Sequence, residues 1–275
     1  MFECVVNISE GRLATASELA WSARRSLCDV HADAVHHRSV VTLINERDEL
    51  RRDVRALISA TMERLDLRSH RGVHPRFGVV DVVPFVALDD EHPDDAEALR
   101  DETAEWIATS FEVPVYLYGP QRDGATRTLP DVRRGAFAGL TPDFGPSEPH
   151  PQRGASAVGA RDILVAWNLW VRGVSLDAGR AIARALRSEH VRSLAFAIDP
   201  FVQISCNLVA PAQVGPEVVY DRVVALLAEG VIDHAELVGL APDAVLAAAP
   251  QRRWAELGLA RETTIEARVA SRRRA

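Results

Sequence analysis

Segments with the spacing of strands and helices follow one another in an order that occurs twice along this chain. In the first half, apolar runs typical of strands lie at residues 2–6, 27–30, 39–44 and 79–86. Apolar residues at helical spacing lie at 13–25 and 49–65. The order is therefore strand, helix, strand, strand, helix, strand, which predicts the split βαβ arrangement of ferredoxin-like domains.

The same order returns after residue 160. Strand-like runs lie at 163–171, 194–198, 201–209 and 234–238, and helical spacing lies at 176–187 and 216–228. Between the two copies come a helix at 93–110, a strand at 113–118 and a stretch rich in glycine and proline at 142–154. We therefore expect an α+β fold of two ferredoxin-like (βαββαβ) subdomains that arose by duplication, at residues 1–160 and 161–275.

Composition narrows the class of function before any motif is considered. The net charge of −7 and the pI of about 5.7 argue against a general nucleic-acid-binding protein. All 32 basic residues are arginine, which excludes a lysine Schiff base and favours binding of carboxylates through guanidinium groups. Cys4, Cys28 and Cys206 are scattered in apolar runs, which fits neither a disulfide framework nor a zinc site.

No segment of the sequence resembles a leader peptide or a membrane span. Glu3 and Asn7 interrupt the first apolar stretch, and no apolar run reaches the roughly 18 residues that a spanning helix needs. We expect a cytoplasmic protein without membrane or nucleic-acid partners.

The densest group of reactive side chains lies at residues 69–78, with the sequence SHRGVHPRFG, just before a predicted strand. Gly72 and Pro75 disfavour a helix, so His70 and His74 are not expected to bind zinc as a helical i, i+4 pair. The position before proline favours extended backbone, which would hold His74 in place as a general acid or base. From the residues alone, a structural or surface histidine is the competing interpretation.

Six segments resemble the formiminotransferase domain family, in the order in which that family has them. The segment from His70 to Asp81 is similar to the family's HxGxHPRxGxxD, and residues 4–11, CVVNISEG, are similar to its opening CVPNFSEG. The other four are VPVYLYG at 113–119, DFGPS at 143–147 with the GA and GAR that follow, VQISCNL at 202–208 and ELVGLAP at 236–242. The resemblance therefore covers nearly the whole chain.

This resemblance implies a folate-dependent one-carbon transferase. Such an enzyme moves a formimino group from N-formimino-L-glutamate to N5 of tetrahydrofolate, a step of histidine degradation, with tetrahydrofolate as co-substrate and without a metal. His74 matches the family's catalytic histidine, which takes a proton from N5 and returns it to the leaving amine. The family also implies a homodimer, here in a stand-alone form without the cyclodeaminase part of the metazoan enzymes.

The resemblance also implies binding residues. Folate would contact the segment Gly145, Pro146, Ser147, Glu148, Pro149, His150, Pro151, Gln152, Arg153 and Gly154, for which an interdomain linker is the competing interpretation. The expected substrate-binding residues are Asn7, Ser9, Glu10, Arg38, His70, Arg76, Gln203 and Asn207. The first three are also interpretable as a helix cap, and the last two as partners of backbone groups.

Three positions near the expected pocket differ from the family pattern. In the family, the second aspartate of a D-x-D pattern pairs with the catalytic histidine, whereas this chain has His31 at that place. Asp29 and Asp33 both remain candidates for orienting the catalytic imidazole. His37 stands where the family has asparagine, and Arg153 where the fused enzymes have an aromatic residue.

These departures keep three alternatives open. The first is a related folate enzyme with another donor, such as 5-formyltetrahydrofolate in a salvage reaction. The second is a folate-binding module without catalysis. The third is a metal-dependent hydrolase that uses the histidines of a polar loop at 31–38 and of the later segment, namely His31, His36, His37, His70 and His74.

Overall fold

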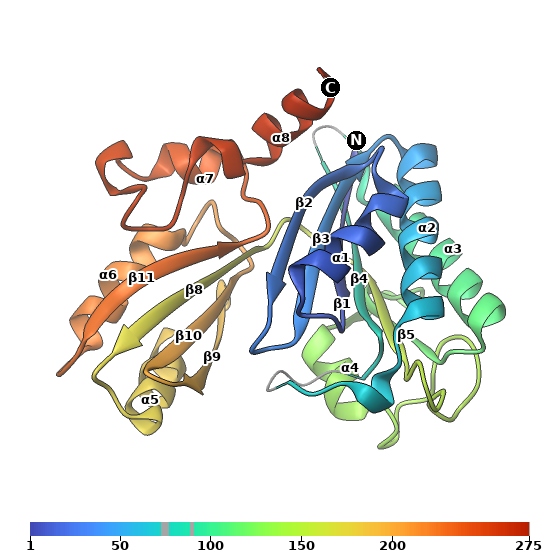
Figure 1. Ribbon diagram of the computed structural model, residues 1–275, viewed down its shortest axis with the longest axis horizontal. Helices are drawn as coiled ribbons and strands as arrows, with labels where there is room; N and C mark the ends of the chain where they lie inside the picture. Colours follow the sequence, from blue (N-terminus) through green and yellow to red (C-terminus); the bar gives the residue numbers. More distant parts are fainter. Residues whose placement is uncertain (73–76, 89–90, 275) are drawn as a thin grey trace. The chain divides into compact units, whose positions relative to one another are not determined.

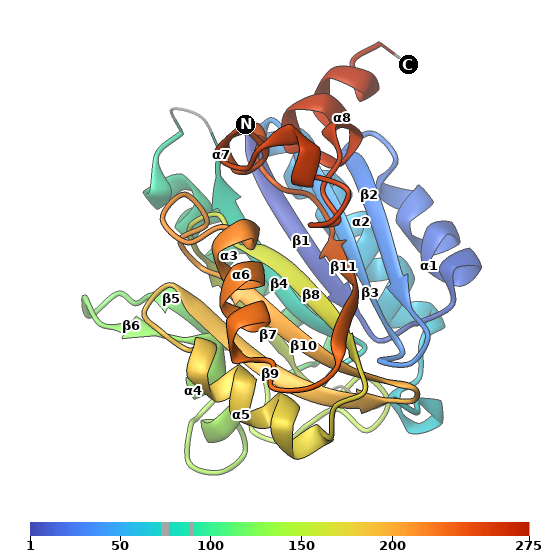
Figure 2. The same ribbon diagram turned by 90° about the vertical axis from the view of Figure 1, so that its left-hand side faces the viewer.

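The computed structural model describes residues 1–72, 77–88 and 91–274, so His74 and Arg76 of the expected site lie outside the described residues. The chain forms two compact units, Met1–Asp162 and Ile163–Ala275. Each unit packs helices against a sheet of its own (Figures 1 and 2). The mixed α+β class, with a large sheet and a second sheet, is confirmed.

The first unit is built on a seven-stranded sheet in the order β2-β3-β1-β4-β7-β5-β6. Its strands are β1 (Phe2–Ile8), β2 (Leu27–Asp33), β3 (Arg38–Asn45), β4 (Val80–Ala87), β5 (Val115–Pro120), β6 (Thr126–Arg127) and β7 (Ser156–Ala160). Its helices are α1 (Leu13–Ala20), α2 (Arg47–Arg64), α3 (Pro93–Phe111) and α4 (Leu129–Gly135), with 3-10 turns η1 (Trp21–Ala23) and η2 (Leu67–Ser69). The strands from β2 to β4 are antiparallel, whereas β7 lies parallel to both β4 and β5.

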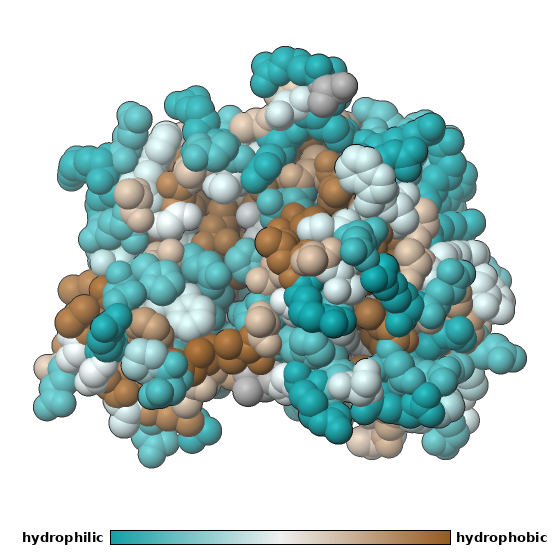
Figure 3. All heavy atoms as spheres, viewed as in Figure 1, coloured by the Kyte–Doolittle hydropathy of each residue, from teal (hydrophilic) through white to brown (hydrophobic). Residues whose placement is uncertain are grey.

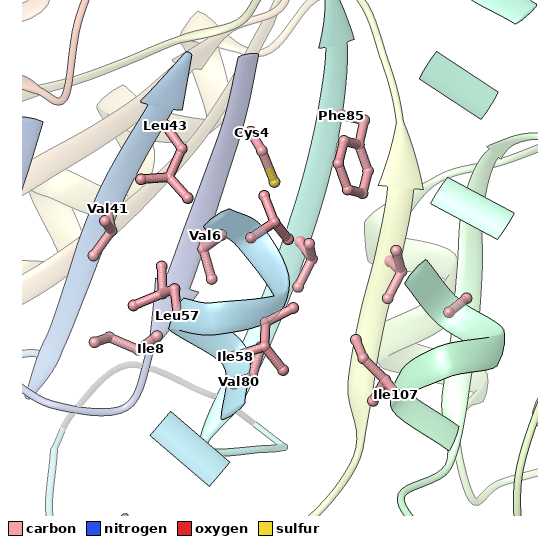
Figure 4. Close-up of a cluster of buried hydrophobic side chains, with 14 of the residues drawn as sticks. Cys4, Val6, Ile8, Val41, Leu43, Leu57, Ile58, Val80, Phe85 and Ile107 are labelled. Atoms are coloured by element: carbon pink, nitrogen blue, oxygen red, sulfur yellow. The ribbon is translucent and has the colours of Figure 1, made fainter. Parts of the chain in front are cut away.

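The hydrophobic core of the first unit lies between the sheet and the helices α1, α2 and α3. Alternate residues of β1, namely Cys4, Val6 and Ile8, have no exposed surface and belong to this core. Figure 4 shows them among the side chains of Leu57 and Ile58 of α2. Full burial of a valine or leucine side chain contributes about 1.5–3 kcal/mol. This packing fixes the register of β1 and therefore the place where the strand ends.

Helix α4 covers part of the opposite face of the same sheet. Along β5, Val115 and Leu117 belong to the core under α3, whereas Tyr116 and Tyr118 pack with Val132 of α4. This alternation is the period of two that a strand imposes. Helix α4 is thereby held on the face that the other three helices leave open.

The second unit is built on a four-stranded antiparallel sheet in the order β11-β8-β10-β9. Its strands are β8 (Val165–Arg172), β9 (Val191–Ile198), β10 (Phe201–Leu208) and β11 (Val231–Val238). Its helices are α5 (Leu176–Leu186), α6 (Pro216–Leu226), α7 (Asp243–Ala248) and α8 (Ile265–Arg272), with 3-10 turns η3 (Gln251–Arg253) and η4 (Arg261–Thr263). The buried Trp167 donates its indole hydrogen to the Leu257 carbonyl at 2.8 Å, which ties the late segment to the sheet.

Sequence patterns predict no element at β6, α4, β7, α7 or α8. β7 has the sequence SAVGA, whose small residues have a weak strand preference, yet all five are buried because β7 lies between β4 and β5. The polar loop expected at residues 31–38 is shorter in the structure. β2 continues to Asp33 and β3 begins at Arg38, so only residues 34–37 form the turn.

Polar and charged side chains cover much of the surface seen in Figure 3, with smaller hydrophobic areas between them. Among the helices of the described residues, none has both the length and the hydrophobicity needed to cross a membrane.

Gly78 lies where two backbone segments meet beside β4. It pairs with Gly154, and a Cβ on Gly78 would lie 1.8 Å from the carbonyl oxygen of Ala155. We predict that Gly78→Ala lowers the free energy of unfolding by at least about 3 kcal/mol, because backbone has to move. A Cβ on Gly135 would meet only the Leu140 side chain, at 3.0 Å. Gly135→Ala should therefore change the free energy of unfolding by at most about 1 kcal/mol. Urea unfolding measures both, and equal losses would contradict this prediction.

Glu3 of β1 is a buried carboxyl group with 4% of its surface exposed. Burial raises the pKa of Glu3 from 4.5 to about 7, although Arg161 acts in the opposite direction. As the pH rises from 4.5 to 7, the unfolded chain loses this proton while the folded chain keeps it, so stability falls with increasing pH. Glu3 should lower the free energy of unfolding by about 3 kcal/mol across this window.

Glu3→Gln should remove this part of the pH dependence. Urea unfolding of the wild type and the variant at pH 4.5 and pH 8 measures it. The two proteins should differ more at pH 8 than at pH 4.5, and a constant difference would count against the buried, protonated carboxyl.

Candidate active site at one end of the seven-stranded sheet

Most of the expected site residues of the first unit lie at one end of its sheet. β1 ends there, and β3 and β4 begin there, at the lower end of the sheet in Figure 1. Backbone hydrogen bonds join the segments: the Ser9 amide donates to the Val79 carbonyl at 2.8 Å, and the Val79 amide donates to the Arg153 carbonyl at 3.0 Å. The end of β1, the approach to β4 and the 145–154 segment are therefore neighbours.

Asn7 and Ser9 do not cap helix α1. The N-cap position is Arg12, and no side chain makes a capping hydrogen bond there. Ser9 Oγ instead donates to the Gly78 carbonyl at 2.8 Å, and Asn7 Nδ2 donates to the Val5 carbonyl at 2.9 Å. The interpretation of Asn7 or Ser9 as the helix cap is therefore wrong, and Ser9 links the end of β1 to the segment that precedes β4.

Glu10 supplies a fixed negative charge next to Ser9. Its side chain is 2% exposed and accepts hydrogen bonds from Arg12, from the amide at 2.8 Å and from Nη2 at 2.6 Å. Burial raises the pKa of Glu10, but the hydrogen bonds from Arg12 and the nearby His37 outweigh burial, and the pKa is lowered. Glu10 is therefore ionised at neutral pH.

Asp33 is engaged within the turn between β2 and β3. One carboxylate oxygen lies 2.6 Å from Nδ1 of His36, and the other accepts the amides of Val35 and His36 at 2.8 and 2.9 Å. Burial raises the pKa of Asp33, but these hydrogen bonds outweigh it and lower the pKa to about 2. The carboxylate is used inside its own turn, which argues against Asp33 as the residue that orients His74. Asp29 lies farther back in β2, half-buried.

His70 connects the loop before β4 to the same turn. It is 5% exposed, and its Nε2 lies 2.7 Å from the His37 carbonyl oxygen. A carbonyl oxygen only accepts, so Nε2 of His70 carries the hydrogen. The rings of His70 and His37 lie 4.2 Å apart, tilted by 51°. The two histidines thus form one packed pair from two segments that are distant in sequence.

Asp81 and Arg133 form a buried ion pair that the expected site did not include. Asp81 has no exposed surface; one oxygen accepts from Arg133 Nη2 at 2.6 Å and the other from the Phe77 amide at 2.9 Å. The Arg133 guanidinium also lies over the Phe77 ring, 5.4 Å from its centroid. Burial lowers the pKa of the Arg38 guanidinium, and the nearby Asp81 opposes that shift. Two arginines therefore lie near one buried carboxylate, whose negative charge offsets part of theirs.

The sequence carried a signal for only one member of this pair. Asp81 interrupts an otherwise apolar strand sequence, and a buried charge requires a partner. Arg133 has no comparable signal, because it is followed directly by Arg134, which makes an exposed ion pair with Asp131. Only the packing of α4 on the sheet distinguishes the two arginines.

The 145–154 segment packs within the first unit, so the interdomain-linker interpretation is wrong. His150 and Gly154 exchange two backbone hydrogen bonds, of 2.9 and 2.7 Å, which close a tight turn. His150 Nδ1 accepts the amides of Gln152 and Arg153 at 3.2 and 3.1 Å. Burial and then Arg153 lower the pKa of His150, so its imidazole stays neutral and keeps this acceptor role. The residues from Gly145 to Pro149 are exposed.

Arg153 anchors the segment rather than pointing free into solvent. Its guanidinium donates to the carbonyls of Met62 at 3.1 Å and Phe111 at 3.3 Å, in the last turns of α2 and α3. A cation at the C-terminal end of a helix also interacts favourably with the helix dipole. The segment is therefore attached to two helix ends.

Gln203 and Asn207 belong to the second unit, on β10. Both lie on the face opposite to the core residues Ile204 and Cys206. Gln203 is 1% exposed, and among the described residues its Nε2 has no hydrogen-bond partner, whereas Asn207 is exposed. The Nε2 of Gln203 therefore makes no backbone hydrogen bond within the described residues. A buried amide without a partner costs about 1–3 kcal/mol, which a ligand would relieve.

Four of the five histidines considered for a metal-dependent hydrolase are described. Across residues 1–72, 77–88 and 91–274, no three side chains of His, Cys, Asp or Glu are grouped as a metal site.

Comparison with known proteins identifies the family. The family model described as the formiminotransferase domain, N-terminal subdomain, matches residues 1–161, which is more than half of the chain and includes this end of the sheet. The chain belongs to the formiminotransferase family. Glutamate formimidoyltransferase of Thermoplasma acidophilum is 34% identical over 272 residues, covering 90% of this chain and 89% of that protein. Glutamate formimidoyltransferase of Streptococcus pyogenes is 34% identical over 203 residues, 67% of each chain.

Longer members of the formiminotransferase family are also similar. Formimidoyltransferase-cyclodeaminase of Dictyostelium discoideum is 30% identical over 283 residues, which cover 90% of this chain but 52% of that protein. The resemblance inferred from six sequence segments is thus confirmed.

The ion pair between Asp81 and Arg133 gives a stability prediction. Asp81→Asn leaves the Arg133 guanidinium beside a neutral amide, and we expect a loss of about 3 kcal/mol in the free energy of unfolding. The double variant Asp81→Asn/Arg133→Met should recover part of this loss, because no unpaired charge remains. Arg134→Met is the matched control: its pair with Asp131 is exposed, so the change should stay below about 1 kcal/mol. Urea unfolding measures all of them together with Arg133→Met alone, and a loss in the double variant equal to the sum of the two single-variant losses would argue against the pair.

Proposed function

We propose that this chain transfers a formimino group from N-formimino-L-glutamate to N5 of tetrahydrofolate, a step in the degradation of histidine. The observation that carries the proposal is the 34% identity to a glutamate formimidoyltransferase over 90% of this chain and 89% of that relative. The chain is therefore a transferase, with tetrahydrofolate as its co-substrate.

His74 is the proposed general acid and base. The N5 atom loses its proton as it attacks the formimino carbon, and the glutamate nitrogen gains one as its bond to that carbon breaks. One imidazole that titrates near neutrality can accept the first proton and deliver it to the leaving nitrogen. His74 lies outside the described residues, and its match to the catalytic histidine of the family's HxGxHPRxGxxD segment supports this role.

The proposed contacts to the donor come from the end of β1 and the start of β3. Both substrates carry carboxylates, and Arg38 and Arg76 are the proposed partners of the glutamate carboxylates. Asn7, Ser9, Glu10 and His70 complete the proposed donor site. The contacts of Glu10 and His70 with His37 support this assignment for these two residues.

Folate contact is proposed for residues 145–154. Gly145 and Gly154 adopt φ angles of 84° and 73°. Residues with a side chain rarely adopt these angles, so the backbone of this segment requires glycine at both positions. Exposed backbone between them offers amides and carbonyls to a ring with many donors and acceptors. Arg153 anchors the segment. In the second unit, Gln203 and Asn207 are proposed to bind substrate, and the unpartnered Nε2 of Gln203 supports this for Gln203.

We also propose that the chain arose by duplication, with subdomains at 1–160 and 161–275. The strand order β4-β1-β3-β2 corresponds to β11-β8-β10-β9, and the helices α1 and α2 correspond to α5 and α6 in chain order. The elements α3, β5, β6, α4 and β7 would then be additions to the first copy. The homodimer and a reaction without metal remain predictions from the family, and the cytoplasmic location remains a prediction from the sequence.

The decisive assay mixes the protein with tetrahydrofolate and N-formimino-glutamate, with N-formyl-glutamate in parallel. His74→Ala should lower kcat at least about 100-fold, the size of effect typical of a lost general acid and base. His92→Ala is the control, because its side chain is 73% exposed and should not affect turnover.

Three results would count against the proposal. Transfer from neither donor by the wild type would remove the proposed reaction. Full activity of His74→Ala would remove the role of this histidine. Folate binding that survives without any turnover would instead favour the non-catalytic module.

A further inference from the structure

His37 has an unusual backbone for a residue with a side chain. It is the last residue of the turn between β2 and β3, and its φ angle is 51°, in the left-handed region. This conformation costs free energy for residues other than glycine, least for asparagine and aspartate. Such strain persists where neighbouring structure enforces it, and it is found often at functional sites.

Two glycines enforce the position of this residue. A Cβ on Gly11 would lie 2.7 Å from Cα of His37, and a Cβ on Gly72 would lie 2.8 Å from Cβ of His37. The backbone after β1 and the backbone of the loop before β4 therefore touch the turn directly. As a result, the imidazole of His37 is held beside Glu10 and against the ring of His70.

In the described part of the chain, packing against neighbouring residues, rather than hydrogen bonding, fixes the position of the His37 imidazole. Its Nδ1 is buried and has no hydrogen-bond partner among the described residues. Its Nε2 lies 3.8 Å from Oε1 of Glu10, too far for a hydrogen bond but close enough for electrostatic attraction. In the neutral form of the ring, the ionised Glu10 favours the hydrogen on Nε2, the nitrogen nearer to it. This leaves the lone pair of Nδ1 as a hydrogen-bond acceptor without a partner.

We propose that His37 binds the formimino group of the donor, with Nδ1 accepting a hydrogen bond from the terminal N–H of that group. This inference rests on the proposed function and narrows it to amidine donors. The terminal atom of a formimino group is a nitrogen that carries hydrogen, whereas that of a formyl group is an oxygen that only accepts. A site that hydrogen-bonds a substrate N–H discriminates strongly against an analogue that lacks it. The negative charge of Glu10 adds to the preference for a protonated amidine.

The experiment compares two ligands in one variant. His37→Gly keeps the left-handed backbone and removes the imidazole. It should lower kcat/KM for N-formimino-glutamate by about tenfold or more, the effect of losing a buried hydrogen bond. The inhibition constant of N-formyl-glutamate should change by less than about twofold. Added imidazole should restore part of the turnover with N-formimino-glutamate.

Two further variants separate binding from folding. Glu112→Gly is the matched control, because Glu112 also has a left-handed backbone, with φ of 53°, at the end of α3. It should leave both constants unchanged. His37→Asn also suits the left-handed backbone, and its amide oxygen can accept the hydrogen bond from the formimino N–H. It should therefore retain more of kcat/KM for N-formimino-glutamate than His37→Gly, and a loss equal to that of His37→Gly would argue against the acceptor role.

The outcomes are distinguishable. An equal change for both ligands, or no change for either, would overturn the inference about His37 while leaving the proposed function intact. A wild type without any transfer would instead remove the proposed function. In that case, calorimetric binding of N-formimino-glutamate to wild type and His37→Gly decides the inference, and equal affinities would overturn it.

Discussion

Backbones touch one another directly at the end of the seven-stranded sheet, and the rest of the candidate site depends on this contact. At Gly78 only a hydrogen atom separates the chain from the Ala155 carbonyl. The same close approach lets the β2–β3 turn lie against Gly11 and Gly72. No side chain fits at these three positions, so three segments that are far apart in sequence are brought to one place. The histidines and carboxylates of the site are carried by these segments or lie beside them.

The acidic groups at this place each have a partner. Asp81 is paired with Arg133, Glu10 with Arg12, and Asp33 with the turn that contains His36. Pairing is the condition under which buried carboxylates stay ionised at modest cost. Buried side-chain atoms without a hydrogen-bond partner in the described part of the chain include Nδ1 of His37 in the first unit and Nε2 of Gln203 in the second. Hydrogen-bonding capacity is thus left unused next to paired carboxylates in the first unit.

Local patterns in the sequence predicted the parts of the fold that are local. The order of the six elements from β1 to β4 follows from apolar spacing, as does the corresponding order from β8 to β11. β7 could not be predicted in this way, because its position between β4 and β5 is decided by burial, and its small residues have little strand preference. The turn at 34–37 was placed too broadly, since polar residues on an edge strand look like a loop.

The same limit applies to the candidate site. Ser9, Glu10 and His70 were found because the segments that contain them resemble motifs of the family. The structure places both Glu10 and His70 against His37. Arg133 was missed because its role depends on where α4 packs. His37 was noted only as a departure from the family. Its left-handed backbone comes from contacts with two distant glycines, which no local pattern reveals.

The contacts of Arg153 limit the insertions and deletions that α2 and α3 can tolerate. Its guanidinium binds carbonyls in the last turns of both α2 and α3. Adding or deleting one residue within either helix would rotate those carbonyls by about 100° around the helix axis. The guanidinium would then lose one of its acceptors, and the 145–154 segment would lose an anchor. Insertions in two helices of the scaffold are therefore constrained by a loop on the surface, and helix length should vary together with the residue at position 153.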